Sequence, residues 1–114
     1  MVVDTACSSS LVALHTAINS IQCGDCDVAV VAAADLILSP YSLKIREASN
    51  MLSQDGKNKT FDAKANGYIR GEGAGAVVIT KLPQGSSADG VLAVITGSCV
   101  NQDGKSASFT GFYP

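Results

Sequence analysis

The segment Val3-Asp4-Thr5-Ala6-Cys7-Ser8-Ser9-Ser10 decides how this chain is interpreted, because it places one cysteine between a short extended run and a run of hydroxyl residues. Apolar residues follow at helical spacing, at Leu11, Leu14, Ile18 and Ile21. Cys7 therefore stands at or just before a helix N-terminus, where unpaired backbone N–H groups favour negative charge. The thiolate is the nucleophilic form of cysteine, and the small residues on both sides leave room for a substrate to reach it.

A structural interpretation of Cys7 stands beside this one, because a lone cysteine among small residues is often a small buried hydrophobe. A nucleophilic cysteine usually needs a partner base, and His15 is the only histidine of the chain. On one continuous helix, eight residues give a rise of about 12 Å and a rotation of about 80° beyond two turns, so the two side chains do not meet. His15 is therefore expected to pack on the helix. Either Cys7 is structural, or its catalytic partners lie outside these 114 residues.

Length and composition predict a small globular domain. The chain has 114 residues, of which 46% are hydrophobic and 16% charged, so it can form a core. Its net charge of −2, with both signs interspersed, excludes the basic stripe of a nucleic-acid-binding surface. We expect no membrane association, because no apolar run reaches spanning length and no secretory pattern opens the chain. The expected location is the cytoplasm.

The four cysteines raise the question of a metal or redox site. Cys23-Gly24-Asp25-Cys26 has Cys-x-x-Cys spacing, but no second pair of ligands matches it, so no metal is expected. A thioredoxin-like motif follows a strand and opens a helix, whereas this one closes a helix and precedes a strand. We interpret it as structural, with Gly24 as the helix cap.

The order of elements predicts an α/β protein. The expected strands are 2–5, 28–34, 76–80 and 91–96, and the expected helices run from Ser9 to Cys23 and from Pro40, capped by Ser39, to about Met51. The three later strands are uninterrupted apolar runs, which is typical of strands buried on both faces in a layered fold with some parallel pairing. Residues 53–66 are polar, with a turn at Asp55-Gly56, and their lysines Lys57, Lys59 and Lys64 indicate a solvated loop.

Gly71, Gly73 and Gly75 do not form a dinucleotide site, because they follow a polar loop and open a strand instead of a helix. Alternate glycines indicate close backbone approach or positive φ, and we expect them to let this segment pass beside the Cys7 turn. Arg70 and Glu72 are expected to pair with each other or to bind loop backbone. These five residues are therefore predicted to support the site structurally.

Several motifs together resemble a known family. The residues that carry the resemblance are 4–11 around Cys7, Leu38-Ser39-Pro40, Phe61-Asp62-Ala63, 67–75 and Asn101-Gln102-Asp103-Gly104. In this order and spacing they are similar to the β-ketoacyl synthase domain of modular type I polyketide synthases. The Cys-Ser-Ser-Ser form resembles that branch and its type I fatty-acid relatives. After Ser108 the chain departs from the family pattern, which usually reads Leu-Thr-Ala-Pro there.

The resemblance implies a thiolase-like fold, a layered α/β architecture of two similar halves. This chain then corresponds to a partial ketosynthase domain, the later part of the first half and the first strand of the second. Its expected organisation is 1–82 as part of the N-terminal half, 83–90 as connector and 91–114 as the start of the C-terminal half.

The resemblance also implies acyl transfer from a carrier-protein thioester onto Cys7, then decarboxylative Claisen condensation with a malonyl-type extender. The backbone N–H of Cys7 would be one oxyanion donor, and two catalytic histidines would lie downstream of this chain. No cofactor is expected to bind directly, since substrates are carried on the phosphopantetheine of acyl carrier protein. The parent domain is expected to be a homodimer and this chain alone to be inactive. The alternatives are a fatty-acid ketosynthase, a segment without independent activity, and a cysteine hydrolase.

Overall fold

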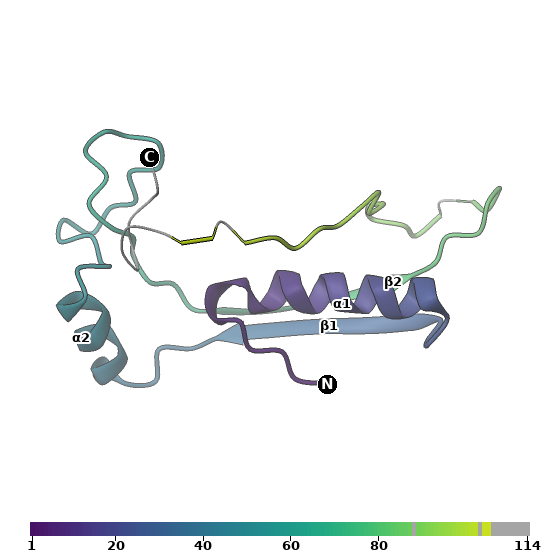
Figure 1. The fold of residues 1–114 in the computed structure, drawn as a ribbon, viewed down its shortest axis with the longest axis horizontal. Helices are drawn as coiled ribbons and strands as arrows, with labels where there is room; N and C mark the ends of the chain where they lie inside the picture. Colours follow the sequence, from purple (N-terminus) through teal and green to yellow (C-terminus); the bar gives the residue numbers. More distant parts are fainter. Residues whose placement is uncertain (88, 103, 106–114) are drawn as a thin grey trace. The chain divides into compact units, whose positions relative to one another are not determined.

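The computed structural model describes residues 1–87, 89–102 and 104–105. Its elements are the 3-10 turn η1 (Ala6–Ser8), helix α1 (Ser9–Cys23), strand β1 (Val28–Asp35), helix α2 (Pro40–Ala48) and strand β2 (Gly73–Thr80), as Figure 1 shows. The chain forms two compact units. One takes in residues 1–33 and 75–102, and the other takes in residues 34–74.

Helix α1 has the bounds that the apolar spacing predicts, and glycine ends it as expected. Gly24 adopts the left-handed conformation, with φ 81°, and its N–H donates to the carbonyl of Ile21. The Asp25 N–H donates to the Ser20 carbonyl at 2.9 Å, which completes the cap. All four cysteines are free, so Cys23 and Cys26 flank a helix cap and form no disulfide.

Helix α2 begins where the Ser39-Pro40 pair predicts. The Ser39 hydroxyl accepts a hydrogen bond from the Tyr41 N–H at 3.2 Å, and Pro40 occupies the first turn, where its missing N–H costs nothing. The helix ends at Ala48 and not near Met51 as predicted. The reason is Asn50, which turns into the left-handed region with φ 53° and so stops the helix.

Strands β1 and β2 form a two-stranded sheet, and three predictions about it need correction. The pair is antiparallel, since the Thr80 hydroxyl at the end of β2 donates to the Asp27 carbonyl before β1 at 3.0 Å. An uninterrupted apolar run is typical of parallel strands but does not require them, because burial on both faces of a sheet favours the same pattern in an antiparallel pair. Strand β2 begins at Gly73, three residues earlier than expected. Neither strand is buried on both faces: Val30 is 67% exposed and Val78 70%, and only alternate residues at the start of β1 and one residue near the end of β2 are half-buried.

The strands predicted at 2–5 and 91–96 are absent from the structure. A strand exists only with a hydrogen-bonded neighbour, and among residues 1–87, 89–102 and 104–105 no segment pairs with either run. The same part of the chain has no buried hydrophobic residue, and its one buried residue is Ser53. None of its helices has the length and apolar character needed to cross a membrane.

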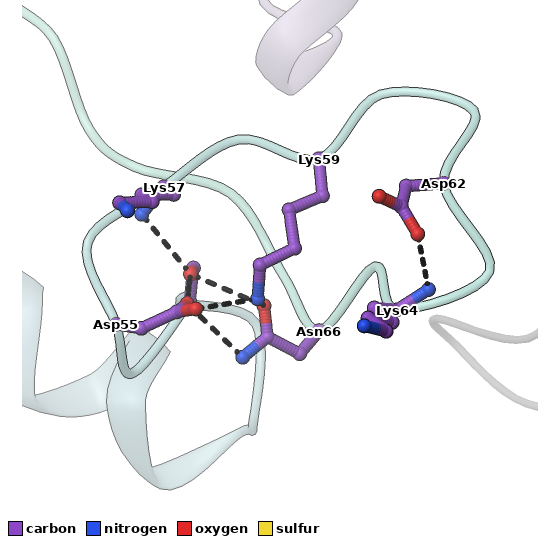
Figure 2. A network of polar contacts seen from close by, with 7 residues as sticks. Asp55, Lys57, Lys59, Asp62, Lys64 and Asn66 are labelled. Carbon is purple, nitrogen blue, oxygen red and sulfur yellow. Dashed lines mark hydrogen bonds and ion pairs between the residues drawn. The ribbon is translucent and has the colours of Figure 1, made fainter.

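The second unit is held by a polar network around Asp55, which Figure 2 shows. The Lys59 ammonium lies 2.6 Å from the Asp55 carboxylate and donates to the Asn66 side-chain carbonyl at 2.8 Å. The Ser53 hydroxyl donates to Asp55 at 2.6 Å, and the Asn66 amide donates to the same carboxylate oxygen at 3.2 Å. We call these four residues the Asp55 network. The expected solvated loop is therefore an internally bonded one, and Lys59 belongs to its structure.

The Asp55 network makes stability depend on pH in a defined direction. The hydrogen bond from Lys59, followed by those from Ser53 and Asn66, holds the pKa of Asp55 well below its ordinary value of 3.8. A carboxylate with a lowered folded-state pKa contributes stability that is present above its unfolded-state pKa and is lost as pH falls toward the folded value.

We therefore expect Asp55→Asn to weaken the acid dependence of the melting temperature, measured in the protein that carries this chain between about pH 5 and about pH 3. Gln54→Ala, at an exposed residue beside the network that carries no titrating group, is the control and should leave the acid dependence as in the wild type. An unchanged pH slope in Asp55→Asn would contradict this account.

Candidate active site at the Cys7 turn

Cys7 is exposed and lies in the middle of η1, the 3-10 turn that leads directly into α1. The predicted position at a helix start is confirmed, with the addition that a tighter turn precedes the α-helix. Ser8 occupies the N-cap position of α1 but makes no side-chain capping bond. The first N–H groups of such a turn have no carbonyl partner within the helix, so they need partners from elsewhere.

Hydroxyl and carboxylate side chains bind the backbone of this turn. Asp4 accepts a hydrogen bond from the Ala6 N–H at 3.1 Å, and Ser9 accepts one from the Thr5 N–H at 2.9 Å. The Ser9 hydroxyl donates to the Ala6 carbonyl at 2.6 Å. The Ser8 hydroxyl lies 2.9 Å from the Thr5 carbonyl and 2.8 Å from the Thr5 hydroxyl. The turn is thus held by its own side chains.

The residues beside Cys7 are predicted only to be small neighbours, and their bonds to the backbone of the turn are an additional finding. A signal was present, because Asp, Ser and Thr commonly hydrogen-bond backbone groups two to four residues away. All three residue types occur within residues 4–9, although small neighbours alone could have been alanine or glycine. The pattern indicates a turn that is fixed locally before any further part of the protein packs against it.

Ala6 is the strained point of the turn, with φ 57° in the left-handed region. That conformation costs a residue with a Cβ about 1–2 kcal/mol. Both backbone groups of Ala6 are bound, its N–H by Asp4 and its carbonyl by the hydroxyl and the N–H of Ser9. These bonds offset the strain and set the direction in which the chain enters Cys7.

Helix α1 borders a groove of about 430 Å³, and His15 is one of the residues that line it. The groove is lined by residues of η1, α1 and the 95–101 segment, including Ser8, Leu11, Ile18, Ile95, Ser98 and Cys99. The His15 Nδ1 is 2.8 Å from the Ser98 hydroxyl, and its Nε2 is 3.1 Å from the Asn19 amide. Both ring nitrogens thus have partners other than Cys7. As predicted, His15 is a packing residue, and its partners connect α1 with the 95–101 segment.

Arg70 and Glu72 do not pair with each other, and only Glu72 binds loop backbone as predicted. One guanidinium nitrogen of Arg70, Nη2, donates to both carboxylate oxygens of Asp35, at 2.7 and 2.9 Å, and Glu72 accepts a hydrogen bond from the Ile37 N–H. Asp35 was not among the predicted site residues, since in the sequence it only closes the apolar run of β1. The Arg70 Nε is buried and has no partner among the described residues.

The three glycines are arranged differently from the expectation. Gly73 and Gly75 are regular positions of β2, and Gly71 precedes it. None of the three has positive φ, and a Cβ on any of them would meet no described atom within 4 Å. The strained glycine of this region is Gly67, which the alternating pattern does not include because it belongs to the loop before the triplet. That the triplet supports the Cys7 turn stays a prediction.

Within the described residues, no group of three His, Cys, Asp or Glu side chains could hold a metal ion. The reactive side chain that this turn presents is the free, exposed thiol of Cys7. An exposed cysteine presented at the start of a helix is typical of enzymes that bind a substrate covalently through sulfur.

The chain belongs to the β-ketoacyl synthase family, since residues 1–85 match the family described as "Beta-ketoacyl synthase, N-terminal domain". It is 50% identical over 108 residues to the highly reducing polyketide synthase alnA of Emericella nidulans, and 54% identical over 108 residues to the highly reducing polyketide synthase VdtX of Byssochlamys spectabilis. These matches cover 94% and 93% of this chain, but only 4% and 5% of the relatives.

A solved structure shows the same relationship. The ketosynthase from module 6 of the bacillaene synthase of Bacillus subtilis 168 superposes with a TM-score of 0.69 at 46% identity, covering 70% of this chain and 14% of that one. The resemblance to polyketide synthase ketosynthases is thereby confirmed, and so is the thiolase-like α/β fold class. The chain spans a small part of the length of each of these three proteins.

Proposed function

We propose that this chain is part of the ketosynthase domain of a polyketide synthase, and that the whole domain forms carbon–carbon bonds through an acyl thioester on Cys7. The observation that carries the proposal is the exposed Cys7 in a strained turn at the start of α1. The identity of about half of the residues to polyketide synthases supports it. The backbone N–H of Cys7 would be one donor to the oxyanion that forms during acyl transfer.

The proposed chemistry has two stages. The Cys7 thiolate attacks the carbonyl carbon of an acyl thioester on carrier protein, a new carbon–sulfur bond forms, and the old one breaks so that phosphopantetheine leaves as its thiolate. A malonyl-type thioester on carrier protein then loses carbon dioxide. The resulting carbanion attacks the carbonyl of the Cys7 thioester, which forms the carbon–carbon bond and releases the Cys7 thiolate.

This chain supplies the nucleophile of that scheme and not its acid–base groups. His15 is bound by Ser98 and Asn19, so both of its ring nitrogens have partners other than Cys7. The two histidines that the family resemblance implies would come from outside these 114 residues, so we expect no turnover from the chain alone.

The wider assignments belong to the same proposal. They are the division at residues 82 and 91 between two halves of a ketosynthase domain, a homodimeric parent in the cytoplasm, and acyl carrier protein as the partner that brings substrates on phosphopantetheine. The glycine triplet 71, 73 and 75, with Arg70 and Glu72, is proposed as structural support of the site. The ion pair of Arg70 and the bond of Glu72 to backbone are consistent with that role.

The test is to locate the acyl group. The ketosynthase that contains this chain is incubated with an acyl thioester in the absence of extender, digested and mapped by mass spectrometry. We expect the acyl mass on the peptide of Cys7. The remaining cysteines, Cys23, Cys26 and Cys99, serve as internal controls, and acylation of one of these with Cys7 unmodified would overturn the assignment.

A further inference from the structure

The hydrogen bonds around Ala6 indicate that the Ser9 side chain fixes the backbone conformation of the turn. Ala6 holds a left-handed backbone conformation that alanine seldom adopts, immediately before Cys7. Such a conformation persists only where the surrounding structure fixes it. The direction of the Cys7 side chain depends on it, because a change in the Ala6 dihedral angles swings the residue that follows.

Ser9 makes hydrogen bonds to the backbone before Ala6 and to the carbonyl of Ala6 itself. Its hydroxyl oxygen accepts the Thr5 N–H at 2.9 Å and its proton goes to the Ala6 carbonyl at 2.6 Å. The Ser9 backbone N–H donates to the same carbonyl. The side chain therefore connects the Asp4–Thr5 peptide group to the Ala6–Cys7 peptide group, so it spans Thr5 and Ala6. Ser10, the next residue of α1, is exposed, and none of the bonds found among the described residues uses its hydroxyl.

We infer that Ser9 is a positioning residue of the acyl-transfer step, which holds Ala6 in the left-handed conformation and so presents the Cys7 thiol to the thioester. This inference rests on the proposed function of Cys7. Ser9 touches no substrate in this scheme. Its effect is on how often the sulfur has the direction needed for attack, so it acts on the rate of acylation and leaves the binding of the thioester unchanged.

The experiment measures the single-turnover acylation of Cys7 by an acyl thioester, at several thioester concentrations, in the ketosynthase that contains this chain. Ser9→Ala should lower the maximal acylation rate by about tenfold while the half-saturating concentration stays within about twofold. Ser10→Ala removes the same hydroxyl one residue later and should behave as the wild type. Equal rates in Ser9→Ala and Ser10→Ala, with Cys7 acylated in both, would overturn the role of Ser9.

Two further measurements separate positioning from general destabilisation. Ser9→Thr keeps the hydroxyl and Ser9→Val has the shape of that threonine without it, so the first should retain most of the acylation rate and the second should lose it. In an Ala6→Gly background, glycine adopts the left-handed conformation without strain, and Ser9→Ala should then lower the rate clearly less than tenfold. An undiminished loss in that background, or equal rates for the Thr and Val variants, would contradict the mechanism. A wild-type protein that is acylated elsewhere than at Cys7 would instead overturn the proposed function itself.

Discussion

Replacing Cys7 by alanine in the ketosynthase that contains this chain is expected to lower the condensation rate by about 10³-fold or more, because the acyl group then has no sulfur to bind to. The substitution removes one exposed atom from a turn that other side chains hold. The melting temperature should therefore stay within about 2 °C of the wild type. Turnover with acyl and malonyl thioesters of carrier protein, measured beside thermal unfolding, checks both parts.

Cys23→Ala is the matched control for this loss, since it changes another free and exposed cysteine, at the other end of α1. We expect it to keep the wild-type rate. Condensation that survives in Cys7→Ala, or an equal loss in both variants, would show that the chemistry does not pass through Cys7.

The second large effect is expected at Gly67, where alanine should lower the free energy of unfolding by about 3 kcal/mol or more. Gly67 has φ 123°, and a Cβ there would lie 2.6 Å from the carbonyl carbon of Leu52 and 2.7 Å from the Met51 oxygen. These are backbone atoms, and they belong to the place where Leu52 and Tyr68 form a β-bridge. Both the conformation and the contact therefore oppose the substitution. Denaturant unfolding of the intact protein measures the loss.

Gly56→Ala separates the two causes. Gly56 also has positive φ, 65°, but a Cβ there would meet nothing within 4 Å. Its substitution should cost only about 1 kcal/mol, which is the strain of the left-handed conformation alone. Equal losses at Gly56 and Gly67 would mean that the crowding of Gly67 against the Leu52 backbone contributes nothing.

The parts of the fold that the sequence predicts well are those that short-range chemistry decides. The apolar spacing, Gly24 and the Ser39-Pro40 pair define α1 and the start of α2, because caps and helix periods depend on neighbours within a few residues. The position of Cys7 before α1 follows in the same way. The family motifs predict the class of protein for a different reason, since they are a match of residues and not a derivation of structure.

The rest depends on partners that are distant in the sequence. The direction of the β1–β2 pair is not written in two apolar runs, and the run at 91–96 remains unpaired in the described residues. Arg70 forms an ion pair with Asp35, which is 35 positions away in the sequence, and no local sequence pattern predicts that pairing. Gly67 and not the more conspicuous triplet carries the strain, because the approach of Leu52 is a tertiary contact.

The ion pair between Asp35 and Arg70 has a consequence for how this region tolerates change. It joins the last residue of β1 to a residue just before β2. The segment between the two strands is therefore a loop whose two ends are held together by this ion pair. The free-energy cost of closing such a loop, which is entropic, rises only with the logarithm of the loop length, by about 0.6 kcal/mol for each doubling. Insertions within residues 60–65, whose backbone hydrogen bonds stay local to that loop, should therefore be absorbed at little thermodynamic cost, whereas the charged pair Asp35 and Arg70 should not vary. In library selections, this region should accept added residues far more readily than it accepts a neutral residue at position 35 or 70.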